Sequence, residues 1–365
     1  MNPYIYVRGL RHADHTVFVV ADGQKQYWDA QFQRMVAYSS GQQVKRSILE
    51  EITNHLGEDP APVTFYFEAP SLKEKEVTTP GDPNFADQLL GGWMIANAGS
   101  EDKASNRTVK RRSPLSISAM RALHPLLSSV TEENLSFDRS DRPDLHQVVA
   151  TDSKGNQLSD DDIVSLLKGS DRSLRRKWIQ ANRRTSGLFV YDVALDLRTL
   201  FSVSSNELEP ELTPAITQKL KGQGWTESKN VFGDCLVAPK ERREQLIPAL
   251  AKALVNWRIT TNQARTYSPM EVLAVAISQD ANKVTGAIRA KLDPESEKPR
   301  AKPVVDDSIP NADVYISLAG GGYFSTNNES HDALQKAEEK LIALMEEFPY
   351  ESQRSTVLDF SAVIM

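Results

Sequence analysis

The chain has 365 residues, of which 40% are hydrophobic and 25% charged, and its formal net charge is -6 at pH 7. This composition predicts a folded protein with a sizeable core, built as one large domain or two ordinary ones. Because the total charge is acidic, there is no global basic field, and any binding of nucleic acid must depend on local basic patches.

The sequence contains no sign of export or of a membrane span. Residues 1–11 are polar and strand-like rather than typical of a signal peptide, and no apolar run approaches the ~20 residues of a membrane helix. The single cysteine, Cys235, excludes an internal disulfide and a cysteine-based zinc cluster, and we expect it to be a small core residue in a strand. Together these features favour a cytoplasmic protein.

The first elements predicted are strands and one helix. Residues 4–7 and 16–20 have strand character, with a charged turn at residues 12–15 between them. A helix is predicted over residues 42–56, and residues 63–68 (VTFYFE) form a further strand. This order is compatible with a compact α+β sheet.

The start of the predicted helix combines a cap with donors for phosphate. Ser40 and Gln43 have the S-x-x-Q spacing of a capping box, and an apolar stripe follows at Ile48, Leu49, Ile52 and Leu56. Lys45 and Arg46 fall off this stripe, so we expect them on the exposed side. Because a helix N-terminus with free backbone N–H groups attracts anions, the two amides of Gln42 and Gln43 and these two cations beside it predict a good grip for a polyanion backbone. An ordinary capped surface helix is the alternative.

Two long polar stretches interrupt the regular pattern, at residues 70–112 and 128–186. The first carries Lys103, Arg107, Lys110, Arg111 and Arg112, and the second carries Arg172, Arg175, Arg176, Lys177, Arg183 and Arg184 around Trp178. Long irregular insertions are usually functional or disordered. Basic side chains suit phosphate contact, and an aromatic among them suits base stacking. The alternatives are a solvated loop for the first run and a buried helix anchor for Trp178.

The second half of the chain returns to regular elements. Strands are predicted at residues 188–200, 272–277, 313–318 and 356–364, and amphipathic helices around residues 246–257 and 334–348. The segment Gly320-Gly321-Gly322 lies between a strand and the last helix, where it could allow close approach of phosphate or ribose. A tight turn without a ligand is the alternative, since neither a Walker loop nor a dinucleotide fingerprint is present.

Catalytic patterns are poor. The six histidines are scattered, and neither H-E-x-x-H nor G-x-S-x-G occurs. Asp138 and Asp141 could hold a metal ion or a water near a nucleic-acid backbone, but pairing with Arg139 and Arg142 on a surface loop is the expected role. We therefore expect no catalytic residue, no metal and no cofactor.

Five segments together resemble a known family. They are SSGQQVKRS at 39–47, DQLLGGWM at 87–94, KRRSPLSIS at 110–118, TSGLFVYDVALDL at 185–197 and NWRITTNQAR at 256–265. In this order and spacing they resemble the backbone subunit of type I CRISPR Cascade complexes, in the DevR-like branch of the RAMP superfamily.

The resemblance implies a single RAMP-type domain over residues 1–365 with an α+β, RNA-recognition-motif-like (ferredoxin-like) palm. Large insertions at about 70–112 and about 128–186 would be a finger or web and a thumb region, with the thumb itself roughly within 140–186. The family's aromatic platform is not evident in the sequence. Copies of such a subunit polymerise as a helical filament along the CRISPR guide RNA (crRNA) and present it for pairing with target DNA. They act in antiviral defence with other Cascade subunits and leave cleavage to a separate nuclease.

The residues expected at the RNA follow from these patterns and from the resemblance. They are Ser40, Gly41, Gln42, Gln43, Lys45, Arg46, Lys110, Arg111, Arg112, Arg175, Arg176, Trp178, Arg183, Arg184, Gly320, Gly321 and Gly322. Two other functions stay open. One is a metal-dependent, RNA-cleaving subunit of a type III-like complex that uses Asp138. The other is a cytosolic enzyme acting on a phosphorylated small molecule through residues 320–322.

Overall fold

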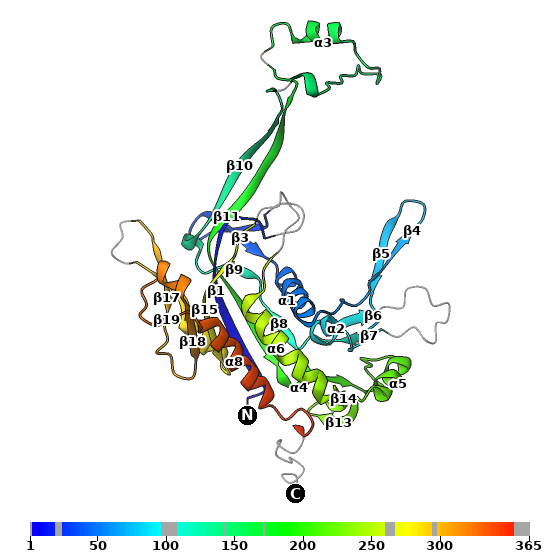
Figure 1. Ribbon diagram of the computed structural model, residues 1–365, viewed down its shortest axis with the longest axis vertical. Helices are drawn as coiled ribbons and strands as arrows, with labels where there is room; N and C mark the ends of the chain where they lie inside the picture. Colours follow the sequence, from blue (N-terminus) through cyan, green and yellow to red (C-terminus); the bar gives the residue numbers. More distant parts are fainter. Residues whose placement is uncertain are drawn as a thin grey trace. The chain divides into compact units, whose positions relative to one another are not determined.

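The computed structural model describes residues 2–18, 24–95, 108–141, 143–170, 172–259, 267–293 and 298–353. The chain divides into two compact units (Figure 1). The first unit comprises Met1–Ser129 and Thr185–Met365, and the second comprises Val130–Arg184.

The first unit is built on an antiparallel sheet with β1 (Tyr4–Thr16) at its centre. Strands β11 (Arg176–Asp196) and β15 (Glu271–Ser278) flank β1, and β8 (Leu115–Ile117) pairs with the other edge of β11. In the sheet these four strands lie in the order β15-β1-β11-β8. Along the chain, the four strands and two of the helices come in the order β1, α1, β8, β11, α6 and β15. This is the β-α-β-β-α-β arrangement of ferredoxin-like folds, so the predicted α+β fold is confirmed.

Within the described residues, six more strands belong to this sheet, and nine others form smaller sheets. The six are β18 (Asp313–Ser317), β19 (Glu329–Ser330), β9 (Met120–Ala122), β3 (Arg34–Ser39), β2 (Gln26–Asp29) and β10 (Ser128–Asp138), which pairs with β11. The smaller sheets are β4 (Thr64–Glu68) with β5 (Lys73–Thr78), β6 (Trp93–Ile95) with β7 (Val109–Arg111), β16 (Ile288–Leu292) with β17 (Ala301–Val305), and β12 (Ser202–Ser204) with β14 (Gly233–Val237) and β13 (Thr226–Asn230).

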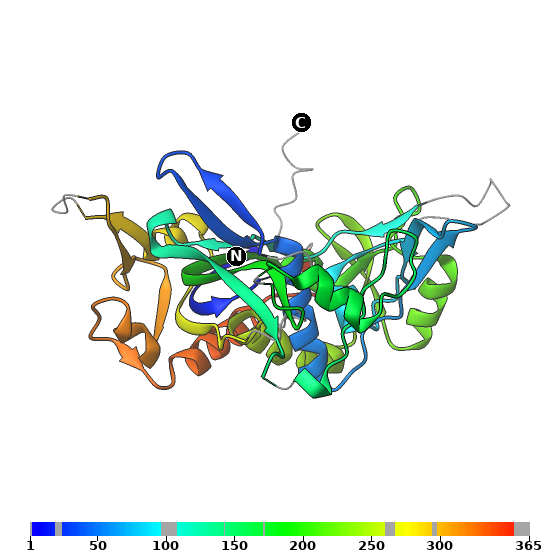
Figure 2. The same cartoon turned by 90° about the horizontal axis from the view of Figure 1, so that it is seen from above.

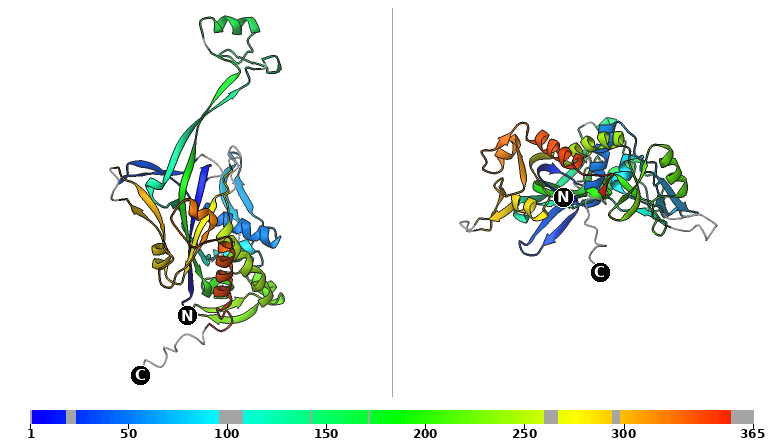
Figure 3. Two further views of the ribbon diagram at one scale, coloured as in Figure 1. Left: turned by 60° about the vertical axis from the view of Figure 1, so that its left-hand side comes forward. Right: turned by 90° about the horizontal axis from the view of Figure 1, so that it is seen from below.

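The long helices lie together on one face of the central sheet. Helix α1 (Gly41–Leu56) packs against α6 (Lys240–Asn256), and α6 packs against α8 (Ala333–Glu346) (Figures 2 and 3). The shorter helices are α2 (Ala86–Gly91), α4 (Leu197–Leu200), α5 (Pro214–Gly222) and α7 (Ala281–Ala287), with 3-10 turns η2 (Pro125–Leu127) and η4 (Leu318–Gly322).

Alternation along the strands separates two buried faces of the sheet. Toward the helices, the hydroxyl of Tyr191 donates to the carbonyl of Leu254 on α6, and the fully buried guanidinium of Arg11 donates to the carbonyl of Val255 at 2.7 Å. Arg11 also lies 4.5 Å from the ring centre of Trp257, a cation–π contact. On the opposite face, Leu10 and Val190 pack in a cluster with residues of α7 and β16.

Several predicted elements differ from those observed. The expected turn at residues 12–15 belongs to β1, which is one continuous strand with an irregular register between Ala13 and Thr16. The strand predicted at 63–68 pairs with β5 in the separate hairpin β4–β5 and does not join the main sheet. The side chains of β4 are all exposed, so they pack against no core. Predicted helices α1, α6 and α8 and strands β15 and β18 are confirmed, and Cys235 is buried in β14 as expected. The strand predicted at 356–364 lies outside the described residues.

The second unit contains the paired parts of β10 (Ser128–Asp138) and β11, and helix α3 (Asp160–Leu167) with the 3-10 turn η3 (Pro143–Leu145). Ser159 and Asp162 make a reciprocal capping box at the start of α3. Among the residues of this unit whose burial is described, Ile163 is the buried hydrophobic side chain, whereas Leu145, Val164 and Leu166 are exposed. Its fold therefore depends on turns and hairpin pairing more than on a core.

Candidate nucleic-acid interface

Helix α1 begins where the sequence predicted, beside the edge of the central sheet. The hydroxyl of Ser40 accepts the backbone N–H of Gln43 at 3.3 Å, while the Gln43 side chain turns to Ser47 instead of completing the box. A Cβ at Gly41 would lie 2.9 Å from the carbonyl oxygen of Ile117, so only glycine allows this close approach. The helix N-terminus, whose first N–H groups have no partner within the helix, is thereby fixed against β8.

The two cations that follow have different surroundings. The prediction that Lys45 is exposed is wrong: its ammonium is half-buried and donates to the carbonyl oxygen of Gly91, the last residue of α2, at 2.8 Å. Burial lowers the pKa of Lys45 to about 8. Arg46 is exposed, as predicted, with 73% of its side chain in solvent, and it pairs with Glu50 one turn along the helix at 2.7 Å.

The basic residues at the end of the first insertion also differ in how far they are exposed. Arg111 in β7 is 4% exposed, and its guanidinium donates to the carbonyls of Leu89, Thr199 and Ser202. It also lies 3.5 Å from Glu211, so its expected place in an exposed loop at the RNA is wrong. Its neighbours Lys110 and Arg112 are exposed, whereas Lys103 and Arg107 lie outside the described residues.

The face of the sheet away from the long helices α1, α6 and α8 carries aromatic and basic side chains that the sequence reasoning missed. The rings of Tyr4 and Tyr6 stack at 5.9 Å, and the guanidinium of Arg198 lies 4.9 Å from the centre of Tyr4. Arg8 and Arg121 both pair with Asp192, at 3.3 and 2.9 Å. The signal was present in YIYVRGLR at 4–11, where Tyr4, Tyr6 and Arg8 alternate with buried aliphatic residues.

This face is continuous with the helix start through a few contacts. The hydroxyl of Ser118 accepts the backbone N–H of Asp192 and lies 3.5 Å from the guanidinium of Arg121. Ser118 also borders the position where Gly41 meets β8. The N-terminus of α1, the two arginines and the stacked tyrosines therefore belong to one connected surface, which we call the palm surface (Tyr4, Tyr6, Arg8, Gly41, Arg121 and Asp192). Arg8 is buried, so the N-terminus of α1 and Arg121 are the donors that this surface offers to phosphate, beside the tyrosine rings that it offers to bases.

In the second unit, the arginines predicted to contact RNA are paired with acids, hydrogen-bonded to a carbonyl oxygen or buried. Arg176 pairs with Asp138 at 2.5 Å, and Arg183 pairs with Glu132 at 2.9 Å. Arg175 donates to the carbonyl of His146 at 3.3 Å. Arg184 is buried, which corrects the expectation that it faces RNA, and the side chain of Trp178 lies outside what the structure describes.

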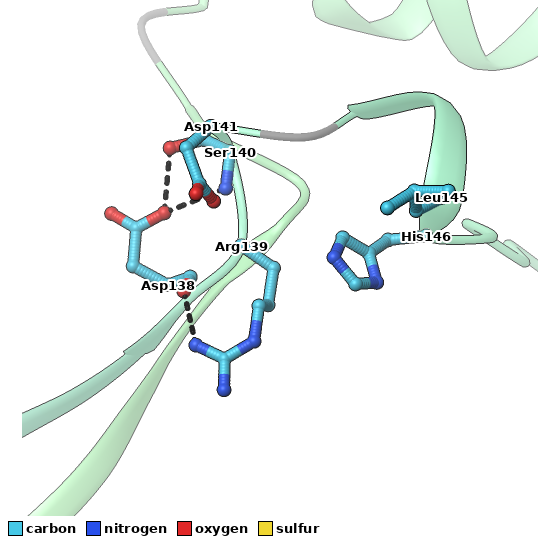
Figure 4. Close-up of a pocket in the computed structure, with 6 residues that line it drawn as sticks. All are labelled: Asp138, Arg139, Ser140, Asp141, Leu145 and His146. Carbon is cyan, nitrogen blue, oxygen red and sulfur yellow. Dashed lines mark hydrogen bonds between the residues drawn. The ribbon is translucent and has the colours of Figure 1, made fainter.

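Asp138 lines an open pocket of this unit together with Arg139, Ser140, Asp141, Leu145 and His146 (Figure 4). Hydrogen bonds from Ser140, and then the ion pair with Arg176, lower the pKa of Asp138 to about 2. The expected pairing of Asp138 with Arg139 is wrong, since Arg139 donates to the backbone oxygen of Asp138 and leaves the carboxylate to Arg176. Arg142 lies outside the described residues.

The glycine segment forms the 3-10 turn η4 rather than an open loop. A Cβ at Gly320 would lie 2.9 Å from the carbonyl oxygen of Leu273, so packing against β15 requires this glycine; Gly321 and Gly322 are exposed. The next residue, Tyr323, holds the turn against the sheet, because its hydroxyl lies 2.8 Å from Nδ1 of His12. The expected contact of residues 320–322 with RNA stays a prediction.

The described ranges contain neither a cluster of metal ligands nor a helix suited to a membrane. There, no group of three or more His, Cys, Asp or Glu residues could hold a metal ion. None of the helices in this part of the chain has both the length and the apolar character needed to cross a membrane.

Comparison with known proteins gives structural relatives only. No protein-family model matches the sequence, and no curated protein matches it. A chain of a "CRISPR RNA-guided surveillance complex, pre-nicking" aligns with 95% of this chain and 89% of its own length, at 9% identity and a TM-score of 0.44. A second, of a "CRISPR RNA-guided surveillance complex", aligns with 95% and 85%, at 11% identity and a TM-score of 0.37. Both TM-scores are below 0.5.

Proposed function

We propose that this protein is a non-catalytic, crRNA-binding backbone subunit of a type I Cascade-like effector complex. Several copies would line one guide RNA and present it for pairing with target DNA. The observation that carries this proposal is the palm surface, where a capped helix start, stacked tyrosines and two arginines lie side by side on a ferredoxin-like sheet. The motif SSGQQVKRS, which carries the sequence resemblance, supplies the helix start of that surface.

The chemistry of this surface suits a backbone-and-stacking mode of binding. Phosphates are attracted by the backbone N–H groups at the N-terminus of α1, and exposed cations outside the palm surface, such as Arg46, Lys110 and Arg112, add to this attraction. Base rings can stack on Tyr4 and Tyr6, and stacking tolerates any sequence. A guide of arbitrary sequence can therefore be held, and recognition of the target is left to base pairing.

The acidic total charge does not oppose this role. Basic groups are needed only where the guide runs, while acidic surface elsewhere keeps an assembly of many copies soluble. Assembly along one strand requires a heterologous interface, because an isologous pair closes on itself. Each bound copy then raises the effective concentration for the next.

Binding to RNAs of increasing length tests the proposal. Purified protein is mixed with RNA, and stoichiometry is measured by size-exclusion chromatography with light scattering. The number of bound copies should rise in steps with RNA length, and the affinity should fall steeply with salt. One copy per RNA at every length, or no RNA binding at low salt, contradicts the proposal.

Paired substitutions locate the phosphate contacts. Lys110→Ala with Arg112→Ala should lower the slope of log affinity against log salt by about 2, roughly one per lost contact. The matched control is Lys291→Ala with Lys302→Ala, which removes two exposed lysines paired across hairpin β16–β17. An equal decrease of this slope in both double variants would show that the salt dependence of RNA binding reflects only the net charge of the protein.

A further inference from the structure

The tip of the hairpin β13–β14 presents an aromatic ring to solvent. Its two turn residues are Val231 and Phe232, between the paired residues Asn230 and Gly233, and Phe232 is 60% exposed. Two-residue hairpin turns usually carry glycine, asparagine or aspartate rather than two hydrophobic residues. When a local preference is broken in this way without a gain in core packing, the physical reason is often a function at that position.

The backbone of this turn is fixed by the buried side chain of Asn230. Its amide nitrogen donates to the hydroxyl of Ser202 on β12 at 3.1 Å, and its amide oxygen accepts the backbone N–H of Phe232 at 2.8 Å. One buried amide therefore ties the turn to the neighbouring strand of its small sheet. A side chain on an anchored turn has less conformational freedom to lose on binding than one on a loose loop.

Arg198 connects the ring of Phe232 to the tyrosines of the palm surface. Its guanidinium lies 4.9 Å from the centre of the Phe232 ring and 4.9 Å from that of Tyr4. The same group donates to both carboxylate oxygens of Asp196 at 2.8 Å, and it also donates to the hydroxyl of Tyr4. Because Tyr4 stacks with Tyr6, the three rings and the guanidinium form one row of planar groups that begins on β1 and ends at the hairpin tip.

The chemistry at the end of this row favours a nucleobase over other ligands. Bases stack on aromatic side chains, and the strand that carries them is anionic, which suits the cation beside the ring. A positively charged ligand is disfavoured, because Arg198 already faces Phe232. An apolar protein segment would have to bury the partly exposed ion pair of Arg198 and Asp196, which costs desolvation free energy. A base brings polar edges that can stay near this pair.

We propose that Phe232 stacks on one base of the bound RNA and extends the strand's path from the palm surface to the tip of β13–β14. The proposal rests on the function proposed above, because the palm surface holds the rest of the strand. Stacking needs only the flat face of a base, so a guide of arbitrary sequence is accepted. Purines, which have the larger ring system, should bind more tightly than pyrimidines at this position.

Substitutions at Phe232 test the stacking, with the full-length protein and the shortest RNA that binds one copy. Phe232→Leu keeps an apolar side chain beside Arg198 but removes the ring, so the affinity should fall about 10-fold. The slope of log affinity against log salt should not change, because no charge is lost. Phe232→Trp should keep the affinity. The matched control is Phe67→Leu, which removes another exposed phenylalanine, on β4, and should bind RNA like wild type.

Abasic nucleotides, placed at one position of this RNA at a time, identify the stacked base. At one position the abasic RNA should bind wild type about 10-fold more weakly, while Phe232→Leu should bind it as well as the intact RNA. Losses that add at every position overturn the proposal, as does an equal loss of affinity in Phe67→Leu. Unchanged affinity in Phe232→Leu overturns it as well but leaves the proposed function standing, whereas no binding of any RNA by wild type overturns both.

Discussion

The basic run that ends in β7 and the basic run of the second unit have similar compositions but opposite surroundings. Arg111 is buried among backbone carbonyls contributed by three different elements. Arg176 and Arg183 are instead about half exposed and face single carboxylates on the paired strand β10. An exposed ion pair contributes little and can exchange its carboxylate for a phosphate, whereas a buried cation cannot leave its partners without a large loss. Arg111 therefore holds the fold together, whereas Arg176 and Arg183 are available for binding.

The substitution Arg111→Ala is the strongest test of whether Arg111 is structural, and the largest effect is expected from it. Its loss leaves three carbonyls and Glu211 without their buried cation, so the free energy of unfolding should fall by about 3–5 kcal/mol. Urea denaturation of the purified variant measures this, with Arg112→Ala as the control, expected within about 0.5 kcal/mol of wild type. If Arg111→Ala weakens RNA binding without a loss of stability, Arg111 contacts RNA and is not a structural residue.

The second unit can be removed as a whole. Thr185 donates to the carbonyl of Ser129 at 2.8 Å, so a short Gly/Ser linker can join these two residues in place of 130–184. The remaining unit should fold and bind RNA without cooperativity, with about 100-fold weaker binding to long RNA. Titrations of a short and a long RNA separate the two effects. Stepwise assembly that persists in the truncated protein would assign the contacts between copies to the first unit.

Lys45 and Arg46 of α1 are likewise a buried and an exposed cation, and the pH dependence of the unfolding free energy should distinguish them. Lys45 has its ordinary pKa of 10.5 when unfolded and a pKa of about 8 when folded, so the unfolded chain binds more protons between these values. The stability contribution of Lys45 should therefore rise as pH increases from about 8 to about 10.5. The difference in unfolding free energy between wild type and Lys45→Met, measured by urea denaturation across this range, should show the rise. The corresponding difference for the exposed Arg46→Met should stay flat.

The smallest effect is expected at Arg183. Because its pair with Glu132 is exposed, Arg183→Ala should change the unfolding free energy by less than about 1 kcal/mol. If it exchanges Glu132 for a phosphate, the salt slope of RNA binding should fall by about 1. The charge-conserving variant Arg183→Lys should keep that slope. A large loss of stability in Arg183→Ala would show that this run, too, is structural.

Much of the α+β layout could be predicted because its signals are local. Helices α1, α6 and α8 follow from apolar periodicity, and the cap of α1 connects residues only three apart. The single strand β1 was missed, since a charged stretch at residues 12–15 looks like a turn when its partners on β11 and β15 are unknown. The alternating Tyr4, Tyr6 and Arg8 carried a signal for the palm surface, which becomes clear only once β1 is placed at the centre of the sheet.

By itself, the sequence determined where helices start, which faces are apolar and which residues carry charge, because these properties act over one or two turns of the chain. The tertiary structure decided which charges are available. Lys45 meets its carbonyl 46 residues away at Gly91, and Arg111 meets one 91 residues away at Ser202. The palm surface likewise joins residues of β1, α1, β9 and β11, which lie far apart along the chain. Burial and partners of this kind depend on contacts between distant segments, and these contacts fix both the desolvation of a charge and the donors around it.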